Sequence, residues 1–224
     1  MRCEQHIPFK EDLFKLVGTM EHQMRKAGVD IRLNTEVTKD YVEKIAPDVL
    51  VVAVGAQPIV PNIPGIDKDK VILANDICTR ESEVGDKVVV LGGGLVGSEL
   101  AVHLAQLNKD VTIVEMLDDI AIDANGRHRP ILLDKLEELC VDVKTGLKGI
   151  AITDTGIVCQ ETCGDNEITL DADTIICAVG QRPLHNVVEG LHDAAPEIVQ
   201  VGDCIKAQKV TEAIRRGYYA ALDI

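Results

Sequence analysis

The 224-residue sequence predicts an α/β fold in which buried parallel strands are covered by helices. The first observation is a pair of continuous apolar runs, VLVVAV at 49–54 and VVVL at 88–91, which suit strands buried on both faces. The second is the order strand, tight turn, helix, strand within residues 87–115. The third is the scarcity of aromatic residues, 2% with no Trp, which leaves Val, Ile, Leu and Ala to fill the core.

The predicted elements follow from apolar periodicity and from the turn residues between the runs. In the first third of the chain they are a helix at 11–27 ended by Gly28, an alternating strand at 29–37, a buried strand at 48–56 and a proline-rich connection at 57–67. Next come a strand at 87–92, a helix at 95–107, a strand at 111–115, a helix at 128–139 and a strand at 141–145. Short antiparallel strands between 148 and 171 lead to a buried strand ending at Gly180, then a short strand at 197–201 and a helix from Thr211.

Composition excludes several classes of protein. Apolar residues make up 46% of the chain and charged residues 27%, as in a soluble globular protein. The net charge of −14 argues against nucleic acid or an anionic membrane as a partner, because both require a basic face. The longest uncharged run, 49–66, contains three prolines and two glycines and is not a membrane helix. The opening MRCEQHIPFKED lacks the apolar core of a secretory signal, so we expect a cytoplasmic location.

Neither a redox cysteine pair nor a metal site is predicted. The seven cysteines are Cys3, Cys78, Cys140, Cys159, Cys163, Cys177 and Cys204. No C-x-x-C spacing occurs among them, so we expect all seven to be reduced and structural. His22 and His103 lie in predicted helices without a second ligand, and the acidic run DDIAID at 118–123 is typical of a solvated loop.

One motif occurs twice. DVLVVAVGAQP at 48–58 and DTIICAVGQRP at 173–183 share an Asp, an apolar strand, A-V-G and a proline three residues after the glycine. Matching register and flanks indicate two related units. The alternative is chance, because A-V-G is common after a β-strand.

The sequence GGGLVG satisfies G-x-G-x-x-G at the turn between the strand at 87–92 and the following helix. Its residues are Gly92, Gly93, Gly94, Leu95, Val96 and Gly97. In such a turn the first glycine permits the sharp reversal, the second lets a pyrophosphate approach the backbone, and the third lets the helix pack closely on the strand. The free N–H groups and dipole of the helix then face the phosphates, so we expect a dinucleotide site.

Two carboxylates near this turn are candidate cofactor-binding groups. Glu115 ends the next strand, 18 residues after Gly97 (115 − 97), where a carboxylate accepts hydrogen bonds from ribose hydroxyls. Glycines needed only for packing do not explain an acid at that position. Glu99 lies in the first turn of the helix, either as an acid favoured by the helix dipole or as a carboxylate near the nicotinamide.

GGGLVGSELA, A-V-G at two strand ends, and IVQVGDC before a helix resemble the flavoproteins with two dinucleotide-binding domains. Over nearly its whole length the chain is similar to the C-terminal part of the 2,4-dienoyl-CoA reductase, 2-enoate reductase and trimethylamine dehydrogenase family. The segments MRCEQHIPFKEDLFKLV, GVDIRLNTEV and KVTEAIRRGYYAALDI carry that likeness. The resemblance implies a Rossmann-like three-layer NAD(P)-binding domain at 82–184 inserted into an incomplete FAD-type domain at 1–81 and 185–224.

The same resemblance implies a function. Full members pass electrons from NAD(P)H through FAD and an iron–sulfur cluster to FMN on an N-terminal barrel. By resemblance this chain is a fragment of an NADH-dependent flavin oxidoreductase of the enoate or 2,4-dienoyl-CoA reductase type, with no catalytic side chain and no activity expected in isolation. Glu99 would lie near the nicotinamide, Gly202 and Asp203 would face the flavin ribityl and phosphate groups, and Gly55 and Gly180 would bind cofactor at the strand ends.

Departures from the family pattern limit these expectations. The chain has a single G-x-G-x-x-G, no cluster-type cysteines and no room for a barrel, so FAD binding is doubtful and FMN, the cluster and the barrel would belong to a missing part of the parent. The alternative function is an isolated dinucleotide-binding module without activity of its own. A self-contained NAD dehydrogenase with its substrate domain at 1–81 lacks a supporting constellation of His, Asp or Lys.

Overall fold

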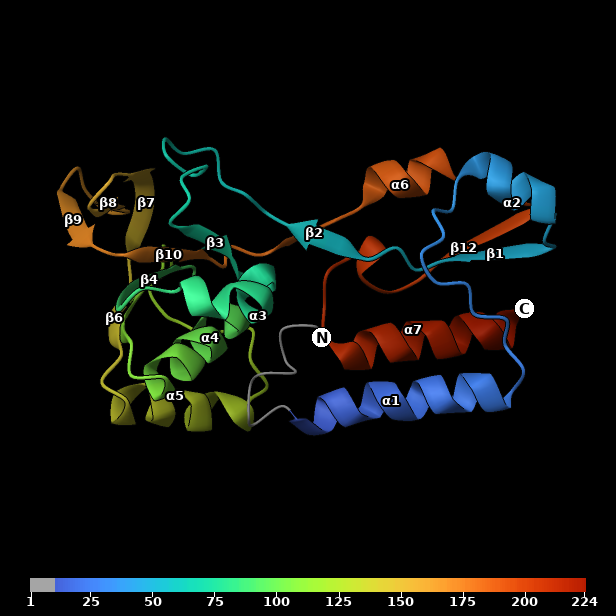
Figure 1. Ribbon diagram of the computed structural model, residues 1–224, viewed down its shortest axis with the longest axis horizontal. Helices are drawn as coiled ribbons and strands as arrows, with labels where there is room; N and C mark the ends of the chain where they lie inside the picture. The colour runs from blue at the N-terminus through green and yellow to red at the C-terminus, as the bar shows by residue number, and fades with distance from the viewer. Residues whose placement is uncertain (1–10) are drawn as a thin grey trace. The chain divides into compact units, whose positions relative to one another are not determined.

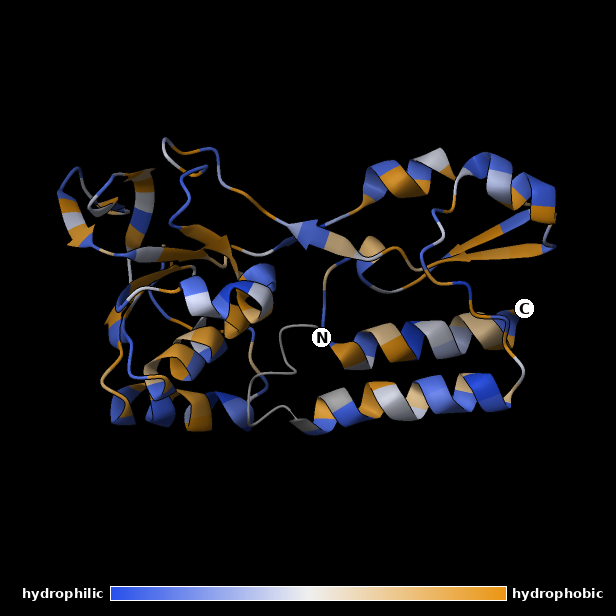
Figure 2. Ribbon diagram, viewed as in Figure 1, coloured by the Kyte–Doolittle hydropathy of each residue, from blue (hydrophilic) through white to orange (hydrophobic). Residues whose placement is uncertain are grey.

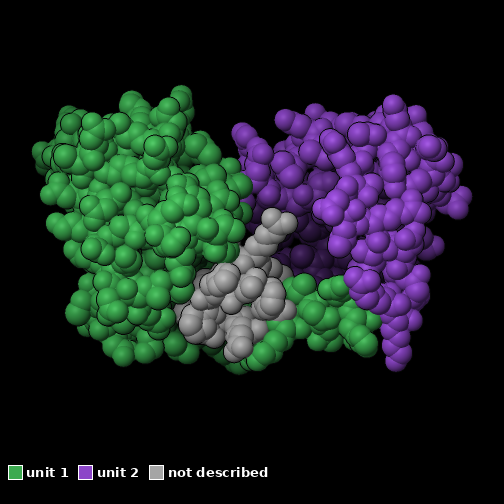
Figure 3. All heavy atoms as spheres, viewed as in Figure 1, with its two compact units in different colours: residues 1–23, 58–180 green, residues 24–57, 181–224 purple. Residues whose placement is uncertain are grey.

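The computed structural model describes residues 11–224 (Figure 1). Internal contacts divide the chain into two compact units, coloured separately in Figure 3. The first unit consists of Pro58–Gly180 together with the residues up to Gln23, and the second of Met24–Gln57 and Gln181–Ile224. No helix among the described residues has both the length and the apolar composition needed to cross a membrane. The similarity expected for residues 1–10, and Cys3 with it, lies outside the described part of the chain.

A five-stranded parallel sheet forms the centre of the first unit. Its strands, in sheet order, are β3 (Val71–Leu73), β10 (Thr174–Cys177), β4 (Lys87–Leu91), β5 (Asp110–Val114) and β6 (Asp142–Lys144). Each neighbouring pair is parallel. All four residues of β10 and the last four of β4 are buried, as expected for strands covered on both faces. The predicted α/β fold class is therefore confirmed.

The two faces of this sheet have separate cores. Val88 and Val90 contact the layer formed by α4 (Leu95–Gln106) and α5 (His128–Glu138). The alternate residues, Val89 and Leu91, pack on the opposite side against an antiparallel three-stranded sheet. That sheet comprises β7 (Leu147–Ile152), β8 (Gly156–Glu161) and β9 (Glu167–Asp171), which is the predicted antiparallel insertion. The unit thus has three layers: the helices, the parallel sheet and the antiparallel sheet. The two outer layers bury the apolar strands of the parallel sheet between them.

Between the proline-rich connection and β4 lie short elements that the sequence analysis did not predict. They are β3, the 3₁₀ turns η3 (Ala74–Asp76) and η4 (Glu81–Glu83), and α3 (Ile77–Arg80). Helix α1 (Glu11–Lys26) agrees with the prediction, and Gly28 after it has a φ of +76° with its N–H donating to the Arg25 carbonyl. This positive φ explains the glycine at the end of the helix.

The second unit has a small core. Strands β1 (Val49–Val52) and β12 (Glu197–Gln200) pair in parallel, and β1 is hydrophobic along its whole length (Figure 2). The remaining elements are α2 (Lys39–Ile45), α6 (His185–Gly190), the 3₁₀ turn η5 (Gly202–Cys204) and α7 (Val210–Asp223). Only four apolar residues form its buried cluster: Val42, Val52, Leu191 and Ala194. Large apolar side chains stay exposed within the unit, including Val51 at 44% and Leu222 at 63%.

One predicted strand was wrong. Residues 29–37 alternate in polarity but form turns and irregular chain, with Asn34 at a left-handed φ of +53°. Leu33 is 75% exposed, so the apolar side of the pattern finds no core to cover. A strand is stabilised by pairing and by burial of one face, and neither is present for this segment. Helix α2 was missed because its seven residues read as a polar connection, although Thr38 caps it by accepting from the Tyr41 N–H.

The duplicated motif has the same structure in both copies. After β1 and β10, Gly55 and Gly180 take positive φ angles of +80° and +111°. Each glycine leads into a three-residue strand that ends at proline: β2 (Ala56–Pro58) and β11 (Gln181–Pro183). These strands pair with each other. The Leu184 N–H donates to Gly55 O and the Ile59 N–H donates to Gly180 O. The two contacts are equivalent, because each donor lies four residues after the glycine of its own copy (59 − 55 = 184 − 180) and donates to the glycine of the other copy. The repeat is therefore structural rather than accidental.

Candidate functional site

The glycine turn joins β4 to α4 in three residues. Gly92 has a φ of +108°, its N–H donates to the Val114 carbonyl at 2.8 Å, and an added Cβ would lie 2.5 Å from the Ala178 carbonyl oxygen. Helix α4 begins at Leu95, with Gly94 as an N-cap that offers no side-chain acceptor. A Cβ on Gly97 would lie 1.9 Å from the Gly92 carbonyl oxygen. Close packing of helix on strand therefore depends on the glycine at 97.

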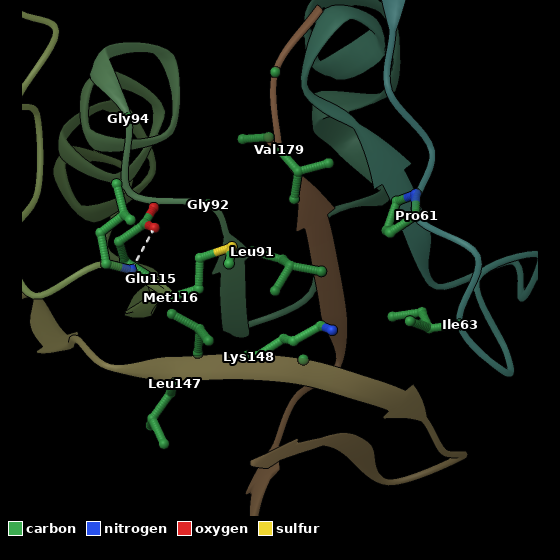
Figure 4. A pocket seen from close by; sticks show the side chains of 15 residues that line it. Pro61, Ile63, Leu91, Gly92, Gly94, Glu115, Met116, Leu147, Lys148 and Val179 are labelled. Carbon is green, nitrogen blue, oxygen red and sulfur yellow. Dashed lines mark hydrogen bonds between the residues drawn. The ribbon is translucent and has the colours of Figure 1, made fainter. Parts of the chain in front are cut away.

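Glu115 connects the glycine turn to the loop after β5. It is 9% exposed, and its two carboxylate oxygens accept from the Gly93 N–H at 2.6 Å and from the Leu117 N–H at 2.9 Å. Figure 4 shows the second of these bonds. Each carboxylate oxygen can accept more than one hydrogen bond, so both retain acceptor capacity. The side chain braces the turn and does not point to solvent.

A cavity of about 400 Å³ opens beside the turn, within the first unit. It lies at the carboxyl ends of β4, β5 and β10, the edge where open parallel sheets bind ligands. Pro61 and Ile63 lie on one side of it, and Glu115 and Met116 on the other (Figure 4). The lining residues are Pro61, Ile63, Leu91, Gly92, Gly94, Val114, Glu115, Met116, Leu117, Leu147, Lys148, Gly149, Ala178, Val179 and Gly180. A mostly apolar lining with a few polar groups is typical of a small-molecule site.

The structure brings only part of the predicted site together. Four predicted residues line this cavity: Gly92, Gly94, Glu115 and Gly180. Gly93, Leu95, Val96 and Gly97 belong to the same turn and first helical turn. Gly55, Gly202 and Asp203 lie in the second unit, after the carboxyl ends of β1 and β12, where one Asp203 oxygen accepts from the Gln208 N–H.

Glu99 does not line the cavity. Its side chain is 3% exposed, and one of its carboxylate oxygens lies 3.3 Å from Nε2 of His128 at the start of α5. His103 lies in α4, as Glu99 does. It is buried with its Nε2 2.6 Å from a Glu81 carboxylate oxygen, which agrees with the packing role expected for it. No group of three or more potential metal ligands occurs among residues 11–224.

The acidic run 118–123 differs from the solvated loop that was expected. Ile120 and Ala121 are buried, and the Ala121 N–H donates to the Gly93 carbonyl at 2.7 Å. The exposed Asp123 directs one carboxylate oxygen to the Leu95 N–H at 2.8 Å, at the N-terminus of α4. No local sequence pattern predicts this contact, because it joins residues that are 28 positions apart.

Sequence reasoning also missed several lining residues. Lys148, on β7, is the one basic residue among those lining the cavity, and Pro61 and Ile63 come from the proline-rich connection. None of the three lies in a recognisable motif. Val179 could have been predicted, because it belongs to the second A-V-G repeat, which marks the end of a buried strand.

All six described cysteines are free thiols. Cys159, Cys177 and Cys204 are buried, whereas Cys140 and Cys163 are exposed. Burial raises the pKa of Cys159 to about 11 and raises the pKa of Cys177. The Cys204 thiol donates to the carbonyls of Val52 and Val201. These environments agree with structural rather than reactive roles for the buried thiols.

Iodoacetamide at pH 8 is expected to modify Cys140 and Cys163 in the folded protein and to spare Cys159 and Cys177 until the chain unfolds. The thiolate is the reacting form, and burial both raises the pKa of these two thiols and blocks the reagent. Peptide mass spectrometry after labelling with and without urea measures this. Rapid labelling of Cys159 without urea would contradict its position in the core.

Comparison with known proteins identifies the group to which the chain is similar. Residues 11–217 match the family model described as pyridine nucleotide-disulphide oxidoreductase. The chain is 33% identical to the bilirubin reductase of Mediterraneibacter gnavus, covering 96% of this chain and 33% of that protein. It is also 33% identical to the cinnamate reductase of Clostridium sporogenes, covering 96% of this chain and 32% of that one. The chain thus spans about a third of the length of these relatives.

Solved structures show the same relation. The 2-naphthoyl-CoA reductase in complex with 2-naphthoyl-CoA matches 100% of this chain and 34% of its own, with a TM-score of 0.91 and 30% identity. The water-forming NADH oxidase of Lactobacillus brevis, bound to NADH, matches 76% of this chain with a TM-score of 0.61 and 22% identity, which is a likeness of fold.

Proposed function

Since the chain belongs to the pyridine nucleotide-disulphide oxidoreductase family, we propose that it is the NADH-binding part of a larger flavin-dependent reductase of the enoate or 2,4-dienoyl-CoA reductase type. The resemblance to the enoate-reductase-like flavoproteins is confirmed by bilirubin, cinnamate and 2-naphthoyl-CoA reductases among its relatives. When bound, the nicotinamide supplies a hydride to the flavin, and the cofactors carry that chemistry. The contribution of this chain is to bind and orient the dinucleotide.

The observation that carries the proposal is the open space over Gly94 beside the braced carboxylate of Glu115. Within residues 11–224, the nearest atom outside its chain neighbours to a Cβ added at Gly94 is an Asp123 oxygen at 3.7 Å, so a pyrophosphate has room to approach the backbone there. The N–H groups at the start of α4 favour its negative charge. The free acceptor capacity of Glu115 suits ribose hydroxyls, and the apolar cavity walls suit the adenine.

The remaining assignments form part of the same proposal. An NAD-binding domain at 82–184 is inserted into an incomplete FAD-type domain at 1–81 and 185–224, and the structural repeat supports two related units. In the complete parent Gly55, Gly202 and Asp203 face FAD, Gly180 faces the dinucleotide, and Glu99 lies near the nicotinamide. FMN, the iron–sulfur cluster and the barrel that carries them lie outside this chain, in keeping with relatives about three times its length.

Calorimetric titration with NADH and with ADP-ribose tests the binding step. Saturable binding of both at one site per chain is expected, because the pyrophosphate and adenosine contacts are common to the two molecules. The chain is then mixed anaerobically with NADH and added FAD, and flavin absorbance is followed to test for reductase activity. Accelerated flavin reduction supports the reductase part over the binding module, whereas binding without acceleration agrees with both, because no activity is expected of the isolated chain. Failure to bind either nucleotide would overturn both.

The purified 224-residue chain is expected to carry little or no FAD. It has one G-x-G-x-x-G turn, which lies in the first unit, and no second one to hold the ADP half of a flavin dinucleotide. The supernatant spectrum after denaturation measures bound flavin. A stoichiometric amount would show that the second unit holds FAD by other contacts.

NADH is expected to bind roughly tenfold to a few hundredfold more tightly than NADPH. The 2′-phosphate would lie beside Glu115, and the residues that follow it, through Asp118 and Asp119, include no base before Arg127. Two like charges ~4 Å apart cost about 1 kcal/mol in water and about 4 at an effective dielectric of 20. Dissociation constants for both cofactors at low salt measure the ratio.

The double variant Glu115→Ser/Met116→Arg is expected to reduce or reverse this preference. Met116→Arg alone is the matched control, because it adds the positive charge and keeps the Glu115 bonds to Gly93 and Leu117. Circular dichroism shows whether loss of these bonds alters the fold. An unchanged ratio in the double variant, or equal binding of both cofactors by the wild type, removes Glu115 as the ribose ligand.

A further inference from the structure

We propose that Asp123 is an internal competitor of the cofactor: its carboxylate occupies the N-terminus of α4 in the unliganded chain and must leave when the pyrophosphate enters. This inference rests on the proposed function and concerns the same site. It makes Asp123 a residue that sets the affinity for dinucleotide without binding it.

Asp123 and the pyrophosphate require the same backbone group. The Leu95 N–H, the first of α4, donates to Asp123 Oδ1 at 2.8 Å. Among the described residues, and apart from the chain neighbours of Gly94, the same oxygen is the one heavy atom within 4 Å of the Gly94 Cβ position, the point where the glycine turn admits phosphate. A carboxylate at a helix N-terminus makes a charge-assisted hydrogen bond and interacts favourably with the helix dipole. Gly94 has no side chain to cap the helix, so Asp123 supplies the missing cap.

The loop around Asp123 is held by contacts that do not involve its carboxylate. The Ala121 N–H donates to the Gly93 carbonyl, and the Arg129 guanidinium donates to the Ile120 carbonyl and to Asp119. Asp123 itself is exposed. Its side chain can therefore rotate into water while the loop keeps its place on the glycine turn.

The charge of Asp123 acts on the entering phosphates as well. A pyrophosphate brings negative charge to the position that an aspartate already occupies, and the next acidic residues, Asp118 and Asp119, are in the same loop. Binding therefore breaks the hydrogen bond of the cap and moves a like charge away. Loss of the carboxylate has two consequences of opposite sign: the unliganded fold is less stable, and the dinucleotide binds more tightly.

Asp123→Asn and Asp123→Ala are the test variants, and Asp118→Asn is the matched control. Asp118 is exposed in the same loop, and its substitution removes the same charge without touching α4. The probes are NADH, ADP-ribose and adenosine, titrated by calorimetry at low salt. We expect NADH and ADP-ribose to bind roughly tenfold more tightly to both Asp123 variants, which is about 1.4 kcal/mol. Adenosine, which has no phosphate, is expected to change by less than about twofold, as is NADH binding to Asp118→Asn.

The melting temperature without ligand gives an independent readout. Asp123→Ala removes a helix cap that contributes about 1 kcal/mol and lowers the melting temperature by roughly 2–4 °C in a chain of this size, whereas the amide oxygen in Asp123→Asn can still accept from the Leu95 N–H and should lower it less. Lower stability with unchanged or weaker NADH binding would make Asp123 a structural cap only and overturn the inference. Equal tightening by Asp118→Asn would attribute the effect to net charge and also overturn it. Absence of nucleotide binding in the wild type and in every variant would instead contradict the proposed function itself.

Discussion

Gly94→Val is expected to weaken NADH binding by at least about 100-fold, close to 3 kcal/mol, while the chain still folds. The backbone at Gly94 has φ −65° and ψ −178°, an extended conformation that valine adopts readily. A Cβ there has its nearest neighbour at 3.7 Å, so the fold has room for it. The methyl groups of valine, however, fill the space through which the pyrophosphate reaches the helix N-terminus. Calorimetric titration with NADH measures the loss, and circular dichroism monitors the fold.

Gly126→Val is the matched control for that variant. Gly126 is exposed in the loop that precedes α5, and in the described part of the chain an added Cβ would have no heavy atom within 4 Å other than those of its chain neighbours. The same substitution there should leave NADH affinity within about twofold, since surface changes away from the site have small effects. Equal affinities of wild type and Gly94→Val would place the phosphate site elsewhere.

Gly97→Val is expected to destabilise the first unit by about 3 kcal/mol or more and to prevent much of the chain from folding at 37 °C. A Cβ at this position would lie 1.9 Å from the Gly92 carbonyl oxygen, which belongs to the backbone of the turn and has no rotamer to change. Helix α4 would have to move away from β4 and from the buried cluster that they share. Urea unfolding monitored by circular dichroism gives the change in free energy of unfolding.

Gly94→Val and Gly97→Val form a pair with opposite expected outcomes. The chemical change is identical and the positions are three residues apart, but one side chain would point into open space and the other into the backbone. The first should lose binding and keep its fold, and the second should lose both. If both variants fold with wild-type stability, α4 does not pack on the turn as the structure describes.

Local signals predicted the centre of the fold. The run KVVVLGGGLVG specifies a buried strand, a turn and a helix within eleven residues, so β4 and α4 could be located from the sequence. Elements that depend on partners distant in the sequence could not be located in this way. Strand β3 has three residues and exists because β10 pairs with it, and residues 29–37 show the reverse case, an alternating pattern with no partner.

The residues of the candidate site also fall into two groups, those that the sequence predicts and those that depend on tertiary contacts. Gly92, Gly94 and Glu115 could be placed because a single motif relates them by sequence spacing. Lys148 and Asp123 reach the same region from β7 and from the loop before α5, and no spacing rule connects them to the glycines. The proposed place of Glu99 near the nicotinamide rests on resemblance alone, and its carboxylate lies 3.3 Å from His128 Nε2, a contact that only tertiary packing determines.

The pairing of β2 with β11 holds the two ends of the segment 58–180 close together. The chain leaves the second unit at Gln57 and re-enters it at Gln181, and the Ile59 N–H donates to the Gly180 carbonyl at 3.0 Å. The two ends of the segment 58–180 are therefore hydrogen-bonded neighbours. We therefore expect that a very short splice would be enough to rejoin the flanks if this segment were removed. Because the residues up to Gln23 also belong to the first unit, the chain crosses between the units three times, and a single proteolytic nick in one crossing would leave the other two intact.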